Sequence, residues 1–241
     1  MFEFLINIFD LFLYRPIFNF LVLVYDYFPL HDFGLSIIIV TIIIRFALYP
    51  LSVKALNSQR VIQKLQPKIN EIQKKYKNDK EKQAQETLEL YRKEKINPFS
   101  GLFLIMVQLP ILIALYRVFS FGLKPEELLH LYSFIPNPGH INPLFLGLID
   151  LSGPNIVFAV LAGLAQFVQT KMLLPKTDKN QKKSNDVSSM VQKQMVYFFP
   201  FITIAILFKL PSALGLYWIV SGVFSVIQQY LIIKNDNRGG N

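Results

Sequence analysis

Arg45 is the residue of this sequence whose chemistry most needs an explanation, because it lies within a long apolar run. A charge near the centre of a membrane helix costs about 3 kcal/mol or more, so such residues usually face a partner or water. Thr41 precedes Arg45 by one helical turn and shares its face. An arginine without a carboxylate at its own depth would attract an acidic or polar segment of another molecule. A second interpretation stays open, in which the guanidinium extends along its own stem to the nearby membrane surface.

Polar residues also recur in the other apolar runs. Gln166 and Gln169 are three residues apart, so they share one helical face. Ser221 is another polar residue within an apolar run, whereas we expect Gln108 and Gln228 to make hydrogen bonds between helices. Hydrogen bonding between helices is also the alternative interpretation of Gln166 and Gln169. The pattern favours a polar groove among membrane helices.

Several kinds of chemistry are not supported. The chain has no cysteine, which excludes disulfides and thiolate sites. Its three histidines, His31, His130 and His140, fall in predicted loops without the ordered spacing of a metal site. The sequence contains no G-x-x-x-x-G-K phosphate loop and no constellation of paired carboxylates or an activated nucleophile. We therefore predict neither a cofactor, nor a metal, nor an enzymatic activity.

The elements that must position these residues are long apolar segments. Hydrophobic residues make up 52% of the 241, gathered in runs close to the 20 or so residues that cross a bilayer. The fold class predicted is an all-α polytopic membrane protein with five transmembrane helices. The predicted spans comprise residues 33–53, 98–121, 154–174, 194–210 and 212–233.

The distribution of the net charge of +9 indicates the orientation. The loop 54–97 carries twelve lysines and arginines, and the region around the loop 175–193 carries six more, whereas the loop 122–153 is far less basic. Because basic loops stay on the cytoplasmic side, the N-terminus is predicted outside and the tail 234–241 in the cytoplasm. Basic residues placed as topology signals argue against a primary role in binding nucleic acid.

Two segments have an expected structure of their own. Residues 1–32 are apolar but interrupted by charges and by Pro16, so we interpret them as helices lying in the membrane interface, with an additional span as the alternative. In the loop 54–97, apolar residues recur at helical spacing on either side of a turn signal at Asn78–Asp79. This pattern predicts a charged cytoplasmic helical hairpin. Either one face of the hairpin rests on lipid or on a partner, or the hairpin is solvated and only fixes the topology.

Four stretches resemble one known family. The segment 34–51 reads GLSIIIVTIIIRFALYPL, 108–116 reads QLPILIALY, 145–152 reads FLGLIDLS, and 215–222 reads GLYWIVSG ahead of Gln228 and Gln229. In this order, and with these loop lengths, they resemble the YidC/Oxa1/Alb3 insertases over residues 13–234. The resemblance is to a short bacterial form without a large periplasmic domain.

The resemblance implies a five-helix core around a hydrophilic groove that is open to the cytoplasm and to lipid. By position, Arg45 matches the groove arginine, Thr41 its neighbour, and Trp218 an aromatic that contacts the substrate. Gln169 matches the groove glutamine of the third span, and Gln166 is the second choice. The implied function is that of a membrane protein insertase and chaperone. Its implied partners are nascent membrane proteins, membrane lipids, and the Sec translocon or the ribosome through the cytoplasmic loops.

Three rival functions also place polar residues inside a membrane. A transporter usually shows internal repeats or acidic relay residues, and the sequence shows neither. A membrane-bound enzyme would need the missing catalytic set. A scaffold that binds a translocon without inserting anything fits the same sequence, and reconstituted insertion of a small protein would separate it from an insertase.

Overall fold

The computed structural model describes residues 2–27, 31–97, 99–172 and 187–239. Its first helical stretch combines α1 (Phe2–Phe9), a π-helical turn η1 (Asp10–Tyr14) and α2 (Arg15–Tyr27). The backbone N–H of Arg15 donates to the carbonyl of Asp10, five residues back. This wider turn immediately precedes Pro16 and lets the chain stay helical past a residue that normally disrupts a helix. The interruption expected from Pro16 is therefore a change of helical winding rather than a break.

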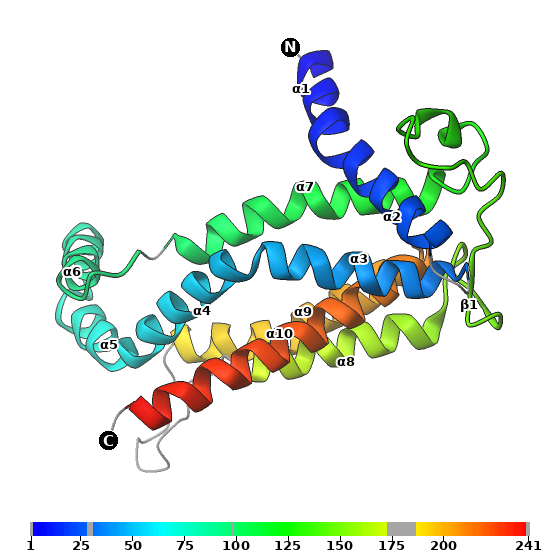
Figure 1. Ribbon diagram of the computed structural model, residues 1–241. Coiled ribbons are helices and arrows are strands. Elements are labelled where there is room, and N and C mark those ends of the chain that lie inside the picture. The colour runs from blue at the N-terminus through cyan, green and yellow to red at the C-terminus, as the bar shows by residue number, and fades with distance from the viewer. Residues whose placement is uncertain (1, 28–30, 98, 173–186, 240–241) are drawn as a thin grey trace.

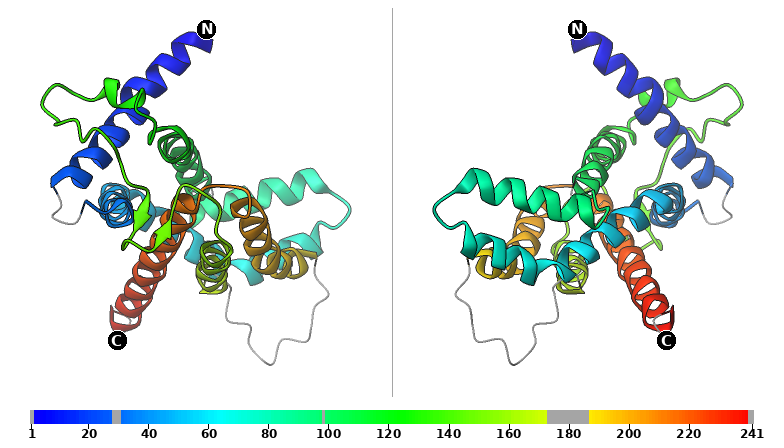
Figure 2. Two further views of the ribbon diagram at one scale, coloured as in Figure 1. Left: turned by 90° about the vertical axis from the view of Figure 1, so that its right-hand side faces the viewer. Right: turned by 90° about the vertical axis from the view of Figure 1, so that its left-hand side faces the viewer.

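The N-terminal helix runs across the other helices instead of beside them (Figures 1 and 2). Residues Glu3–Tyr27 are long and apolar enough to cross a membrane, as are Phe103–Phe121 and Ser212–Lys234. The transverse direction of α1 and α2 supports the interfacial interpretation, which stays a prediction. The count of five spans also stays a prediction.

The apolar run predicted as one span over residues 33–53 is divided by a bend of 63°. Helix α3 (Phe33–Ala47) ends before Leu48, and α4 (Tyr49–Lys64) begins one residue later. Pro50 lies in the first turn of α4, where its missing N–H and its ring prevent continuation of the preceding helix. The last residues of the predicted span therefore belong to a second helix, and the bounds 33–53 of the span stay a prediction.

The basic segment continues as α4, α5 (Gln66–Lys75) and α6 (Lys80–Lys93). The predicted turn at Asn78–Asp79 lies between α5 and α6, and the side chain of Asp79 caps α6 by accepting from Lys82 N at 2.9 Å. Across the turn, the Tyr76 hydroxyl donates to Glu86 Oε1 at 3.1 Å. These contacts hold α5 and α6 together as a hairpin.

The remaining long helices are α7 (Ser100–Phe121), α8 (Ile156–Met172), α9 (Val187–Leu207) and α10 (Ser212–Gly239). Helix α9 begins seven residues before the predicted span 194–210, and α10 extends past the predicted end at 233 into the expected tail. Of the predicted loop 175–193, residues 175–186 lie outside the described residues.

A short cap lies at the end of the bundle where α2 meets α3 (Figure 1). It contains a 3₁₀ turn η2 (Glu127–His130) and a hairpin of two strands, β1 (Leu144–Phe145) and β2 (Ile149–Asp150), paired antiparallel. Asp32 joins this hairpin to the bundle, because its carboxylate caps α3 at Leu35 N (2.8 Å) and accepts from Leu146 N (2.5 Å). The cap is thereby tied to the first turn of α3.

The helices pack around α10, which contacts α8 on one side and α3 on another, while α8 packs against α9 and α4 against α7. The outer faces of α7, α8 and α9 expose large apolar side chains, among them Phe103, Met106, Val157, Leu164 and Phe201. A surface of this kind suits lipid and is costly in water. The predicted fold class, an all-α polytopic membrane protein, is confirmed.

Candidate functional site

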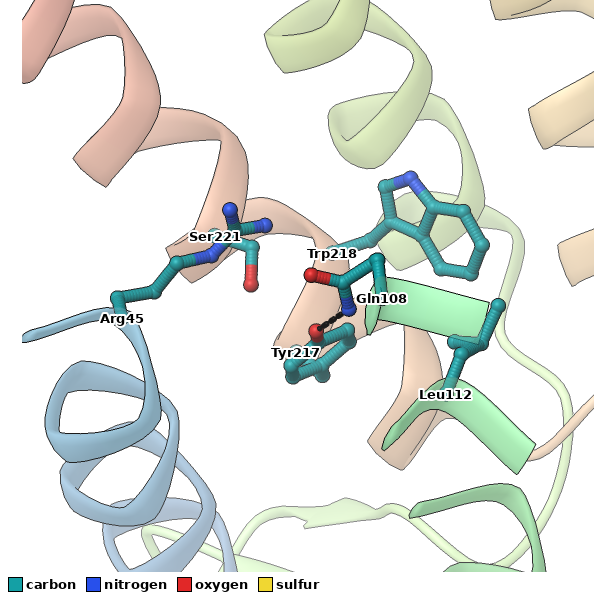
Figure 3. A pocket seen from close by; sticks show the side chains of 6 residues that line it. All are labelled: Arg45, Gln108, Leu112, Tyr217, Trp218 and Ser221. Carbon is teal, nitrogen blue, oxygen red and sulfur yellow. Dashed lines mark hydrogen bonds between the residues drawn. The ribbon is translucent and has the colours of Figure 1, made fainter. Parts of the chain in front are cut away.

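A small cavity of about 100 Å³ lies where α3, α7 and α10 meet. Six side chains line it and are drawn in Figure 3: Arg45, Gln108, Leu112, Tyr217, Trp218 and Ser221. The polar ones come from three helices that are far apart in the sequence, so only the folded bundle brings them together. The cavity has the mixed polar and apolar lining of a binding site.

Arg45 reaches from the last turn of α3 toward Ser221 on α10 (Figure 3). Its Nε is buried without a hydrogen-bond partner, and so is the hydroxyl of Ser221, which is 2% exposed. Among the described residues no carboxylate forms an ion pair with Arg45. Buried donors without partners are rare in folded proteins and point to a ligand or water at that position. The cation and the hydroxyl therefore remain available to a guest in the cavity.

Gln108 and Tyr217 form one wall of the cavity. The side-chain amide of Gln108 donates to the Tyr217 hydroxyl at 2.5 Å, which ties α7 to α10. The predicted hydrogen bond between helices is thus confirmed for Gln108. It is also confirmed for Gln228, which donates to Ser52 Oγ on α4 at 2.7 Å. Because Gln108 also lines the cavity, its amide is both a tie between helices and part of the site.

Trp218 is held by a glutamine of α8. Its indole Nε1 donates to Gln166 Oε1 at 3.1 Å, and the hydroxyl of Thr203 on α9 donates to the same oxygen at 3.0 Å. The ring of Tyr217 meets the indole edge to face, with centroids 6.4 Å apart. The polar edge of Trp218 is therefore engaged within the protein, and its ring is the part that lines the cavity.

Not every predicted groove residue reaches this cavity. Thr41 is buried, and its hydroxyl donates to Ile37 O within α3 at 2.6 Å. Gln169 is half-buried on α8 and is not among the side chains that line the cavity. The structure therefore brings Arg45 and Trp218 together, with Gln166 behind the indole, and leaves Thr41 and Gln169 outside the lining. The roles of all five in binding a substrate stay predictions.

Tyr217 and Leu112 complete the lining and escaped the sequence analysis. Leu112 follows Gln108 by four residues, and Tyr217 precedes Ser221 by four, so each shares a helical face with a polar residue already noted. Helical spacing from Gln108 and Ser221 would have found both.

A second intramembrane arginine also escaped the sequence analysis. Arg117 lies near the end of α7, forms an ion pair with Asp10 of η1, and has its guanidinium carbon 4.3 Å from the centre of the Tyr14 ring. Tyr14 in turn donates to Glu127 of the cap at 2.6 Å. This cluster fastens the N-terminal helix to α7. The signal was available, because Arg117 is the one charged residue in the run 98–121.

Metal chemistry receives no support from the part of the chain that the structure describes, where no three His, Cys, Asp or Glu side chains gather as a metal site would require.

Comparisons with known proteins agree on one family. Residues 23–238 match the family model described as 60Kd inner membrane protein. The membrane protein insertase YidC of Fusobacterium nucleatum is 39% identical over 203 residues, which cover 84% of this chain and 87% of that protein. The YidC of Geobacter metallireducens is 34% identical over 92% of this chain but only 37% of its own length.

A solved structure adds to the likeness. The crystal structure of an active YidC insertase, with its first transmembrane domain resolved, has a TM-score of 0.57 and 29% identity. The alignment covers 93% of this chain and 46% of the solved one. The chain thus spans less than half the length of that protein and most of the length of the Fusobacterium relative.

Proposed function

The chain belongs to the 60Kd inner membrane protein family of membrane protein insertases, and we propose that its cavity is the point at which a guest protein first leaves water. The guest is a nascent membrane protein with an apolar segment and a short polar tail. The polar tail enters among α3, α7 and α10, and the apolar segment then moves sideways into the bilayer. The insertase acts alone or beside the Sec translocon.

One observation carries this proposal: the unpaired Nε of Arg45 and the unpaired hydroxyl of Ser221 meet at one cavity. A peptide or carboxylate taken from water into hydrocarbon loses its hydrogen bonds, at a cost of several kcal/mol. Donors that are already desolvated, and held in place by the helices, replace part of the lost hydration. Acidic tails gain most, because a hydrogen bond to a charged group contributes about 1.5 kcal/mol or more.

Release into lipid needs no fuel beyond transfer of the apolar segment. Each buried methylene contributes about 0.8 kcal/mol, so a hydrophobic span gains far more than a short tail loses. The exposed apolar faces of α7 and α8 are the surfaces along which such a segment would move. The ring of Trp218 extends the apolar surface into the cavity.

The chain is a multi-pass protein of the bacterial inner membrane. We further propose that its N-terminus lies outside and its C-terminus in the cytoplasm, because the basic helices α4, α5 and α6 then lie on the cytoplasmic side. In that position the hairpin of α5 and α6 could contact membrane lipids or a translating ribosome. Its many lysines would favour either anionic surface.

The test is insertion of a short single-span protein with an acidic translocated tail into proteoliposomes that contain the full chain. The variants are Arg45→Ala and Arg45→Lys, and Arg15→Ala is the matched control, because Arg15 is exposed on α2 outside the cavity. We expect Arg45→Ala to lower insertion about tenfold, the factor that corresponds to 1.4 kcal/mol. Arg45→Lys should retain most of the activity, and Arg15→Ala should match the parent.

A second guest, with the tail carboxylates replaced by their amides, separates charge from general polarity. If Arg45→Ala impairs both guests equally, the cation does not act by recognising charge. If Arg45→Ala inserts both guests at the parent rate, the cavity is not the entry point. Failure of the parent to insert either guest would favour a scaffold.

A further inference from the structure

Gln166 lies where three membrane helices meet. Its side-chain oxygen accepts from Thr203 of α9 at 3.0 Å and from the indole of Trp218 of α10 at 3.1 Å, while Gln166 itself belongs to α8. Thr203 is buried, with 6% of its surface exposed. The two hydrogen bonds occupy both lone pairs of one amide oxygen. The contact therefore joins α8, α9 and α10 at a single atom.

The chemistry of the partners fixes the direction of these bonds. An indole N–H can only donate, so the amide of Gln166 must turn its oxygen, and not its nitrogen, toward Trp218. An indole N–H that is buried without an acceptor costs the full desolvation penalty of that group. Trp218 is thus held in the orientation that keeps its N–H on Gln166.

A second contact restrains the same ring. Tyr217 meets the indole edge to face at an interplanar angle of 82°, and the Tyr217 hydroxyl is held by Gln108. The indole is therefore fixed at its N–H by α8 and α9, and it is restrained further by a tyrosine that is tied to α7. What remains for the cavity is ring surface.

We propose that Gln166 and Thr203 are positioning residues, which hold Trp218 so that it offers a guest its ring and withholds its N–H. This inference rests on the proposed function and names the chemistry of one part of its site. Trp218 then recognises the apolar side chains that flank the polar tail of a guest, while Arg45 and Ser221 receive the polar groups. A single cavity thus binds a guest at the boundary between its polar tail and its apolar segment.

Spectroscopy tests the positioning without any insertion assay. Trp218 is the single tryptophan of the chain, so protein labelled with ¹⁵N-tryptophan gives one indole N–H resonance. Gln166→Leu removes the acceptor and should shift the indole proton upfield, whereas Gln166→Glu keeps an acceptor and should leave the resonance near its parent position. Thr203→Val should produce a smaller shift, because the Gln166 oxygen stays but loses one of its two donors.

The matched control is Thr170→Val. The Thr170 hydroxyl lies one turn along α8 and donates to the backbone carbonyl of Gln166 at 2.7 Å, not to its side chain. This variant should leave the indole resonance in place. An unchanged resonance in Gln166→Leu would overturn the proposal, and so would a shift in Thr170→Val as large as that in Thr203→Val.

Insertion rates then test the consequence by a double-mutant cycle. Gln166→Leu should lower insertion about fivefold in the parent, the factor for about 1 kcal/mol, and should have no further effect once Trp218→Phe has removed the N–H. Trp218→Phe alone supplies the reference rate for the second background, because it keeps a ring but has no N–H. Equal losses from Gln166→Leu in both backgrounds would overturn the proposal. If the parent itself inserts nothing, the proposed function fails, while the N–H resonance still decides the positioning.

Discussion

Replacement of Gly34 by alanine tests whether the cap is seated on the bundle as the structure shows. Gly34 lies in the first turn of α3, directly beneath the ring of Phe145 in β1. A Cβ at residue 34 would lie 2.1 Å from Phe145 Cδ2 and 2.5 Å from Cγ. Contacts this short cannot exist, so the ring must move. Phe145 also meets Phe158 of α8, at 6.5 Å between ring centroids, so its movement disturbs the packing of α8 as well.

The magnitude follows from two opposing effects. Overpacking of a close contact destabilises a protein by about 1–3 kcal/mol. Alanine in place of glycine in a helix returns about 0.5–1 kcal/mol. From the middle values of the two ranges we expect Gly34→Ala to lower the free energy of unfolding by about 1 kcal/mol. Gly101 of α7 is the matched control, because a Cβ there has no neighbour within 4 Å. Gly101→Ala should be neutral or slightly stabilising.

The assay is denaturant unfolding of the full chain in detergent micelles, followed by circular dichroism. Phe145→Ala removes the ring that the new methyl group would meet. The double variant Gly34→Ala with Phe145→Ala should therefore be more stable than the sum of the two single effects predicts, by about 1 kcal/mol or more. If the two effects simply add, or if Gly34→Ala is as stable as the parent, the hairpin does not rest on α3 and the reasoning is refuted.

Two other predictions concern ties between helices. Arg117→Lys should loosen the N-terminal helix, because lysine keeps the charge for Asp10 but loses the flat contact with Tyr14; faster proteolysis within α1 would show this, and cleavage at the parent rate would contradict it. Gln228→Leu should destabilise the fold by about 1–3 kcal/mol, because it leaves the buried hydroxyl of Ser52 without its donor. The double variant Gln228→Leu with Ser52→Ala should be little less stable than Gln228→Leu alone. A fully additive loss of stability in the same unfolding assay would contradict the hydrogen bond.

The helices, and the polar residues that accompany Arg45, could be predicted because both follow from the spacing of residues close together in the sequence. Apolar runs of bilayer length indicate helices whatever their neighbours are. The ends of helices were harder, since Pro50 bends the first run and the apolar pattern continues across the bend. Similarly, α9 begins in a polar stretch that composition alone assigned to a loop.

The arrangement of the site could be predicted only in part, because it depends on helix rotation. Helical spacing could not decide between Gln166 and Gln169, which lie three residues apart on one face, and the resemblance favoured Gln169. In the structure Gln166 meets Trp218. Tyr217 was overlooked because a tyrosine in an apolar run is usually a residue that packs between helices. Its partner Gln108 lies 109 residues away, a separation that periodicity cannot bridge.

The bend at Pro50 also places Arg45 at the end of a helix, and no carboxylate of the described residues forms an ion pair with it. Helix α3 ends at Ala47, so Arg45 lies in its last turn, where a single N–H, that of Leu48, serves the carbonyl groups of both Ile44 and Phe46. Pro50 has no N–H to offer the carbonyl of Phe46, four residues earlier. The end of a helix carries a partial negative charge of roughly half an elementary unit, which stabilises a cation nearby. An unbent span would have placed Arg45 mid-helix, with every carbonyl paired and this stabilisation lost. Because the helix end offsets only part of its charge, Arg45 can stay in place without a permanent partner and still attract an acidic guest.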